Sequence, residues 1–139
     1  LIVWTNIRSF IKGSLEALSS VDHVVSKEDF LSFGKKRCRY SDQQRDQIYS
    51  IFEQYQEFLH SNGMWDDCDR ILSLLLRLQK SPDHTARLQW SKVYVDEVQD
   101  YTQTECLVFF KLCGIGNLFL AGDPAQNVAR GVGRYFRHH

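Results

Sequence analysis

Apolar side chains recur every three or four positions through much of the first 80 residues, which is the spacing of helices with one buried face. The longest such run extends from Ser41 to about His60. Ser41 and Gln44 can form a capping box at its beginning, and Ser61-Asn62-Gly63 supplies its end. We therefore predict an amphipathic helix whose apolar face carries Ile48, Ile51, Phe52, Tyr55, Phe58 and Leu59.

Two further segments of this region also have helical patterns. Ser26 and Asp29 can begin a short helix over the sequence EDFLSF, by the same capping chemistry. Residues 66 to 79 form the third predicted helix, which is acidic at its beginning and basic at its end, as the helix dipole favours. Pro82 follows and terminates it. The first 80 residues are therefore expected to be mostly helical.

The pattern changes after Trp90. Residues 92 to 95 are a short run rich in β-branched side chains, typical of a strand buried on both faces of a parallel sheet. Thr102 and Glu105 then form a capping box for a helix that Gly114 can end. Residues 117 to 121 are a second apolar strand. Strand, helix and strand in this order predict a β-α-β unit with parallel strands and a right-handed crossover.

Polar residues follow both predicted strands. The first strand runs into VYVDEVQD, where Asp96 and Glu97 come directly after the apolar residues, and the second runs into Gly122 and Asp123. Ligands of open α/β sheets bind beyond the carboxyl ends of the strands. The two polar groups are therefore expected at the same edge of the sheet. The alternative is a strand that simply ends in a solvated turn.

The residue types at this edge suit a magnesium–nucleotide site. Mg²⁺ takes hard oxygen ligands, usually one or two carboxylates together with phosphate oxygens and water, so Asp96 can hold it. A neighbouring carboxylate such as Glu97 can accept a proton from an attacking water. The amides of Gln99 and Gln126 can donate to a phosphate oxygen and accept from water.

The composition indicates a globular protein with a packed core and argues against a membrane protein. A chain of 139 residues with 43% hydrophobic side chains is long enough for a packed core. Its formal net charge is zero, so no global field indicates a nucleic-acid partner. The apolar runs are too short to span a bilayer, so we expect no membrane association. The four scattered cysteines indicate reduced, partly buried thiols and a nuclear or cytoplasmic location.

The motif DEVQD at residues 96–100 resembles motif II, the Walker B element, of the UvrD/Rep-type helicases of superfamily one. GDPAQ at residues 122–126 resembles their motif III, and the acidic helix that begins near Asp66 resembles the one that precedes motif II there. The sequences VWTNIRSFIKGSLEAL and ARGVG are most like the branch found in large eukaryotic proteins with TPR and ankyrin repeats. The resemblance implies an α/β fold: residues 1–80 as a helical 1B-like insertion, and residues 81–139 as part of a RecA-like P-loop NTPase core.

The resemblance also implies roles for individual residues, with ATP and Mg²⁺ as cofactors. Asp96 would bind magnesium and Glu97 would be the catalytic base. Gln126 would contact the γ-phosphate. The remaining implied roles are those of Gln99 and Asp100, which would link the nucleotide site to neighbouring motifs, and of Asp123, which would support the motif III loop.

The sequence also departs from the helicase pattern. It contains no P-loop G-x-x-x-x-G-K-[S/T], and the second RecA-like domain with its arginine finger is absent, so this chain alone is expected not to hydrolyse ATP. We expect it to be part of a larger polypeptide. Ala129 and Gly131 occupy the positions where relatives carry aromatic residues that stack on single-stranded bases. Three arginines near the end of the chain, which could touch phosphates, are Arg130, Arg134 and Arg137.

Two hypotheses about function follow. The first is a part of an ATP-dependent nucleic-acid helicase or translocase, for which the resemblance implies single-stranded nucleic acid as a partner, DNA ahead of RNA. The alternative is a catalytically inactive helicase-like scaffold or interaction module, which keeps the fold and has lost the motor. A chain without independent function is a third, less informative hypothesis.

Overall fold

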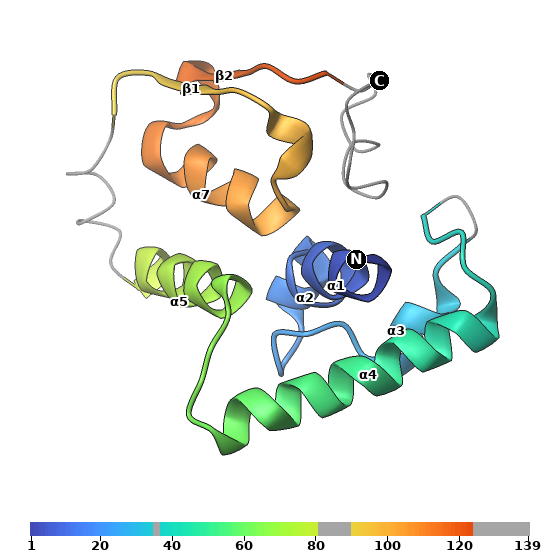
Figure 1. The fold of residues 1–139 in the computed structure, drawn as a ribbon. Coiled ribbons are helices and arrows are strands. Elements are labelled where there is room, and N and C mark those ends of the chain that lie inside the picture. The colour runs from blue at the N-terminus through green and yellow to red at the C-terminus, as the bar shows by residue number, and fades with distance from the viewer. Residues whose placement is uncertain (35–36, 81–89, 124–139) are drawn as a thin grey trace. The chain divides into compact units, whose positions relative to one another are not determined.

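A computed structural model describes residues 1–34, 37–80 and 90–123 of the chain. The chain forms two compact units, Leu1–Arg70 and Ile71–His139, each drawn in Figure 1. The boundary between the two units follows Arg70, whereas the sequence predicts a domain boundary at residue 80. The assignment of residues 1–80 to a 1B-like insertion and of residues 81–139 to a RecA-like core stays a prediction.

The described part of the first unit is helical, as predicted. Phe30, Tyr49 and Phe52 are buried in its core, where neighbouring rings of this series lie 5.9 and 5.3 Å apart between centroids. The Tyr49 hydroxyl donates to the carbonyl of Val25 at 2.9 Å, so its polar end is satisfied inside the core. The helical elements are α1 (Ile2–Asn6), the π-helix η1 (Ile7–Lys12), α2 (Leu15–Ser19), α3 (Lys27–Ser32) and α4 (Asp42–Ser61).

The long helix α4 begins and ends as the sequence predicts. Ser41 accepts from the backbone N–H of Gln44, and the Gln44 side chain accepts from the backbone N–H of Ser41, which completes the capping box. The expected apolar face is partly wrong, because Ile51 and Phe58 are exposed. Each precedes a buried position by one residue and is therefore rotated by about 100° from the buried stripe.

Helix α5 (Asp67–Lys80) begins within the first unit and continues into the second. Asp66 and Asp69 cap it reciprocally: each carboxylate accepts from the backbone N–H of the other residue, at 3.0 Å in both cases. The predicted helix over residues 66–79 is confirmed within one residue. The acidic beginning therefore satisfies backbone donors that the first helical turn leaves free.

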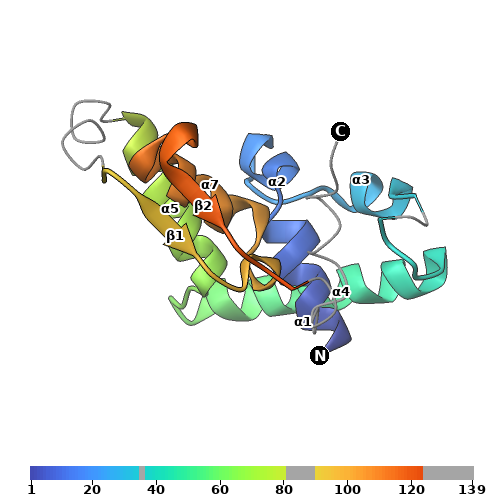
Figure 2. The same ribbon diagram turned by 90° about the horizontal axis from the view of Figure 1, so that it is seen from above.

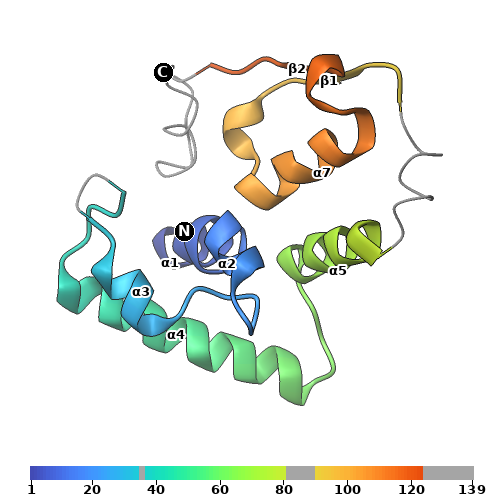
Figure 3. The ribbon, with the colours of Figure 1, turned by 180° about the vertical axis from the view of Figure 1, so that it is seen from behind.

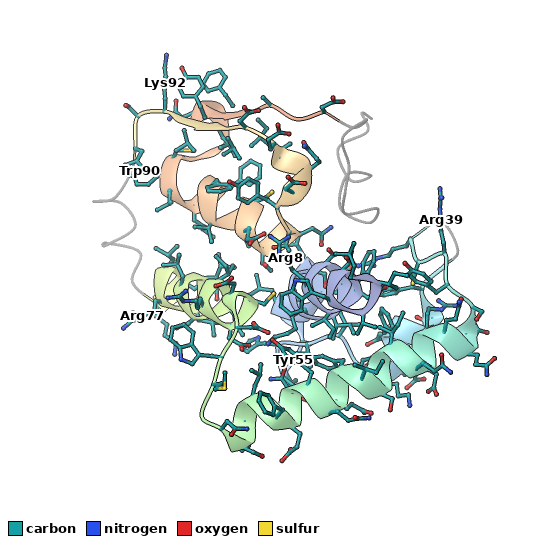
Figure 4. All side chains as sticks on the ribbon, viewed as in Figure 1. Arg8, Arg39, Tyr55, Arg77, Trp90 and Lys92 are labelled. Carbon is teal, nitrogen blue, oxygen red and sulfur yellow. The ribbon has the colours of Figure 1, made fainter. Side chains whose placement is uncertain are left out.

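A buried lysine meets these same carboxylates. The Lys12 Nζ atom lies 2.8 Å from Asp66 Oδ2 and 2.6 Å from Asp69 Oδ1, and its side chain is only 3% exposed. The Tyr55 hydroxyl, which points from α4 toward the first helices of this unit, also donates to Asp66 Oδ2, at 3.0 Å (Figure 4). We call these four residues, Lys12, Tyr55, Asp66 and Asp69, the Lys12 cluster.

The second unit contains the predicted β-α-β arrangement. Strand β1 (Val93–Val95) pairs in parallel with β2 (Leu118–Leu120), and the two strands lie side by side in Figure 2. Between them lie the 3-10 helix η2 (Val98–Asp100), α7 (Gln103–Cys113) and the 3-10 helix η3 (Ile115–Asn117). The parallel sheet is confirmed. A complete RecA-like core stays a prediction, because the described strands number two.

Helix α7 covers one face of this sheet, as Figures 1 and 3 show. Val93 and Val95 pack there with Cys106 and Cys113 of the helix. The prediction of burial on both faces is wrong for the described chain, because Tyr94 is 70% exposed. Side chains alternate between the faces of a strand, so Tyr94 lies on the face away from α7 and stacks on its register partner Phe119, 4.9 Å between centroids.

The capping of α7 and the state of the cysteines follow the predictions. Thr102 and Glu105 form the expected capping box, and Gly114 follows the last turn with a φ of 74°. The four cysteines, which all lie among the described residues, form no disulfide and are buried. No helix among the described residues is both long enough and apolar enough to cross a membrane.

Candidate nucleotide-binding site

The carboxyl ends of the two strands lie together, as predicted. Beyond the paired strands, the backbone N–H of Ala121 donates to the carbonyl of Val95 at 2.8 Å. The N–H of Val98 then donates to the carbonyl of Ala121 at 2.9 Å. These two hydrogen bonds continue the strand pairing across DEVQD and Gly122-Asp123. The acidic group after β1 is therefore held against the segment after β2 at one edge of the sheet.

Glu97 has a backbone conformation that is uncommon for a residue with a side chain. Its φ and ψ angles of 52° and 41° lie in the left-handed region. Outside glycine this conformation carries a strain of roughly 1–2 kcal/mol, which the surrounding structure has to offset. The N–H of Glu97 donates to Asp96 Oδ1 at 2.9 Å, and its carbonyl accepts from the N–H of Asp100 at 2.9 Å. The chain therefore turns sharply at Glu97 immediately after the strand.

The carboxylates here are accessible to a ligand. Asp96, Glu97 and Asp100 are exposed, whereas Gln99 between them is buried. Among the described residues, no three His, Cys, Asp or Glu side chains gather to form a metal site made by protein alone. Exposed, adjacent carboxylates fit the different arrangement that Mg²⁺ adopts with nucleotides, in which phosphate oxygens and water complete the shell. The donor set thus suits one part of a magnesium–nucleotide site.

Gln99 connects the two strand ends. Its side-chain Nε2 donates to the Glu97 carboxylate, and its Oε1 accepts from the backbone N–H of Asp123 at 3.1 Å. The residue is 4% exposed, so both ends of the amide are used inside the structure. A buried amide with both groups paired is stable, while losing either partner would leave a polar group unsatisfied.

Gly122 makes room for this amide. A Cβ atom on Gly122 would lie 2.5 Å from Gln99 Oε1 and 2.9 Å from Val98 Cγ1. Both distances are shorter than van der Waals contact, so a larger residue would displace the Gln99 side chain. The sequence contained a signal for this restriction, since Gly122 directly follows a predicted strand end. No pattern in the sequence predicts the contact itself, because the residues that Gly122 meets lie more than twenty positions earlier.

The other predicted site residues have different outcomes. Asp123 lies at the edge through its backbone N–H, which is the group that Gln99 accepts from. Asp100 follows in η2 and is exposed. Gln126 lies outside the described residues, as do Ala129 and the three arginines near the end of the chain. The described residues therefore bring together Asp96, Glu97, Gln99 and Asp123.

The thiol nearest in sequence to this edge is not a candidate nucleophile. Cys106 packs beneath the sheet, and burial, together with the negative charge of Glu105, raises the pKa of its thiol to about 11. A thiol with so high a pKa carries very little thiolate at neutral pH. The chemistry of this edge therefore depends on its carboxylates and amides.

Comparisons with known proteins relate the sequence to a helicase family. The sequence pattern of the UvrD/REP helicase N-terminal domain matches residues 9–130 of the chain. The human protein TPR and ankyrin repeat-containing protein 1 is 37% identical over 134 residues, a match that covers 94% of this chain and 4% of that protein. The chain therefore corresponds to a small part of that relative. No solved structure matches the chain.

Proposed function

Because the chain belongs to the UvrD/REP helicase N-terminal domain family, we propose that it supplies the magnesium–ATP hydrolysis motifs of an ATP-dependent nucleic-acid helicase or translocase. The observation that carries the proposal is the meeting of DEVQD and Gly122-Asp123 at one edge of a parallel sheet. Ligands of parallel α/β sheets bind at that edge.

The proposed roles of the residues are those that the resemblance to the helicase motifs implies, and the exposure of the carboxylates supports them. Asp96, exposed at the end of β1, is the magnesium ligand, and the neighbouring Glu97 is the general base that takes a proton from the attacking water. When bound, Mg²⁺ neutralises charge on the phosphate oxygens. Gln126 is proposed to contact the γ-phosphate, Gln99 and Asp100 to link the nucleotide site to neighbouring motifs, and Asp123 to support the motif III loop. ATP and Mg²⁺ are the cofactors.

The proposed partner is single-stranded nucleic acid, with DNA ahead of RNA. Family membership supports a nucleic-acid partner in general. The sequence weakens the case for base stacking, because Ala129 and Gly131 replace the stacking aromatic residues of relatives. Nucleotide binding is therefore the better supported half of the proposal. The proposal also includes a nuclear or cytoplasmic location and a place within a larger polypeptide.

The decisive experiment is turnover in a protein that joins this chain to a P-loop and an arginine finger. Glu97→Gln should bind ATP and Mg²⁺ and lose turnover by about 100-fold or more, because a lost general base typically costs a factor of 10² to 10⁴. Phosphate release measures turnover, and a fluorescent ATP analogue measures binding. Glu53→Gln, an exposed carboxylate on α4, is the matched control and should leave both unchanged.

A scaffold without motor activity is the alternative, favoured by Ala129 and Gly131 at the positions where relatives carry base-stacking aromatic residues. It predicts that Glu97→Gln and the unsubstituted protein bind partners equally well, with and without ATP. Turnover that persists in Glu97→Gln would refute the base assignment. A joined protein that neither binds nor hydrolyses ATP would favour the scaffold.

A further inference from the structure

The Glu97 carboxylate needs a defined direction if it is to activate a water molecule. Its backbone is held in the left-handed region by hydrogen bonds on both sides, but these fix the main chain and leave the side chain free to rotate. Because Glu97 is exposed, contacts with solvent alone would not hold its side chain in one rotamer. Within the part of the chain that the structure describes, the Gln99 amide donates a hydrogen bond to this carboxylate.

We infer that Gln99 is the positioning residue for the Glu97 carboxylate, and that it responds to the segment after β2 through the Asp123 N–H. The inference rests on the proposed function, in which Glu97 is the base. Gln99 suits the task because one side chain must donate to a carboxylate and accept from a backbone N–H. A Glu at this position has no N–H to give, and a Leu has neither group.

Gly122 is the second requirement. The Gln99 amide reaches Asp123 because no side chain stands on Gly122, where a Cβ would approach Oε1 to 2.5 Å. A displaced amide would lose the Asp123 N–H and, since the amide is rigid and planar, would also draw Nε2 away from Glu97. A movement of the segment 121–123 would therefore change the direction of the Glu97 carboxylate. This links the end of β2 to the proposed base through one side chain.

The test compares Gln99→Leu and Gly122→Ala with Gln54→Leu, a matched change of an exposed glutamine on α4. Hydrogen exchange reports the contact directly. In both test variants the Asp123 amide should exchange about 5- to 10-fold faster, the effect of losing one hydrogen bond of typical strength. The Ala121 amide, which donates to Val95, should keep its protection and so show that the sheet remains folded.

Kinetics report the consequence in the protein that carries the P-loop. Both test variants should lower kcat by about 10-fold or more and leave KM for ATP close to its original value, because the base is misdirected while the nucleotide contacts remain. A purely structural role would instead change KM and kcat together or remove the Ala121 protection. Unchanged kcat in both variants would overturn the inference.

One measurement needs no substitution and guards against variants that do not fold. The unsubstituted protein should give an NOE between the Gln99 side-chain amide protons and the Glu97 γ-methylene, and its absence would overturn the inference. These outcomes separate the inference from the proposed function. If Glu97→Gln retains turnover, the function fails even where the NOE and the exchange results hold; if only those contacts fail, Gln99 is not the positioning residue and Glu97 can still be the base.

Discussion

Replacing Lys12 by methionine should destabilise the first unit strongly. The Lys12 ammonium is 3% exposed and lies within 2.8 Å of carboxylates on both Asp66 and Asp69. Methionine has a similar length and removes the charge, which leaves the Asp66 carboxylate, itself 8% exposed, without its cation. Removing one partner of a buried ion pair costs about 3–5 kcal/mol, because the remaining charge stays buried and uncompensated.

Two features of the cluster place the expected loss at the lower end, about 3 kcal/mol. Asp69 retains 27% exposure, so water can hydrate it when the lysine is gone. Asp66 also keeps the Tyr55 hydroxyl and the Asp69 N–H as donors. Even so, a loss of this size is a large part of the roughly 5–15 kcal/mol that a domain has in total.

Urea unfolding followed by far-UV circular dichroism measures the change in free energy of unfolding. Lys27→Met is the matched control, because Lys27 pairs with Asp46 at the surface, where both side chains are exposed. The control should unfold at nearly the original urea midpoint. If Lys12→Met shifts the midpoint no more than Lys27→Met, the Lys12 cluster does not stabilise the unit. Tyr55→Phe removes one hydrogen bond of the cluster and should lower the free energy of unfolding by about 1 kcal/mol. This variant tests the cluster if Lys12→Met does not fold.

Three other predictions concern stability. Burial alone would raise the pKa of Asp66, but the hydrogen bonds and charge of Lys12 outweigh it and hold that pKa below its usual 3.8. The stability that this carboxylate contributes is therefore complete above about pH 5 and is lost as the pH falls through the folded-state pKa. Acid titrations should show that Lys12→Met loses less stability between neutral and acid pH than the unsubstituted protein does. Glu97→Gly should be more stable than Glu97→Ala by about 1 kcal/mol in urea unfolding, because glycine adopts the left-handed conformation without strain; equal stability would refute the strain. Thr102→Ala removes the cap of α7 and should lower the thermal midpoint, with about 1 kcal/mol of lost stability, whereas an unchanged midpoint would show that the cap contributes nothing.

The features that sequence reasoning predicted well are local. The capping boxes at Ser41 and Thr102 involve residues three positions apart, so their chemistry is visible in a short stretch of sequence. The parallel pairing of the strands followed from a rule about connections, since a helix between two apolar strands leaves few topologies. The shared edge for DEVQD and Gly122-Asp123 came from the same rule.

The features that the sequence did not predict depend on tertiary packing between residues that lie far apart in the chain. The Lys12–Asp66 contact joins residues 54 positions apart, and no sequence period indicates it. Tyr94 has a side chain common in buried strands, yet its exposure depends on which face of the sheet α7 covers. Phe58 is as apolar as its neighbours on α4, but the buried stripe is narrower than the apolar stripe.

Two of the acidic clusters in the chain, Asp66 with Asp69 and Asp96 with Glu97, resemble parts of the helicase pattern, but their physical surroundings differ. The carboxylates of Asp66 and Asp69 are occupied by a buried ammonium and by backbone donors, so they are satisfied before any ligand arrives. Asp96 and Glu97 are exposed, and the backbone that presents them is strained at Glu97. Strain that a fold maintains around exposed carboxylates requires an explanation other than stability. The resemblance to helicases includes both groups, but only Asp96 and Glu97 are exposed enough for the proposed ligand, whereas Asp66 and Asp69 cap the beginning of helix α5.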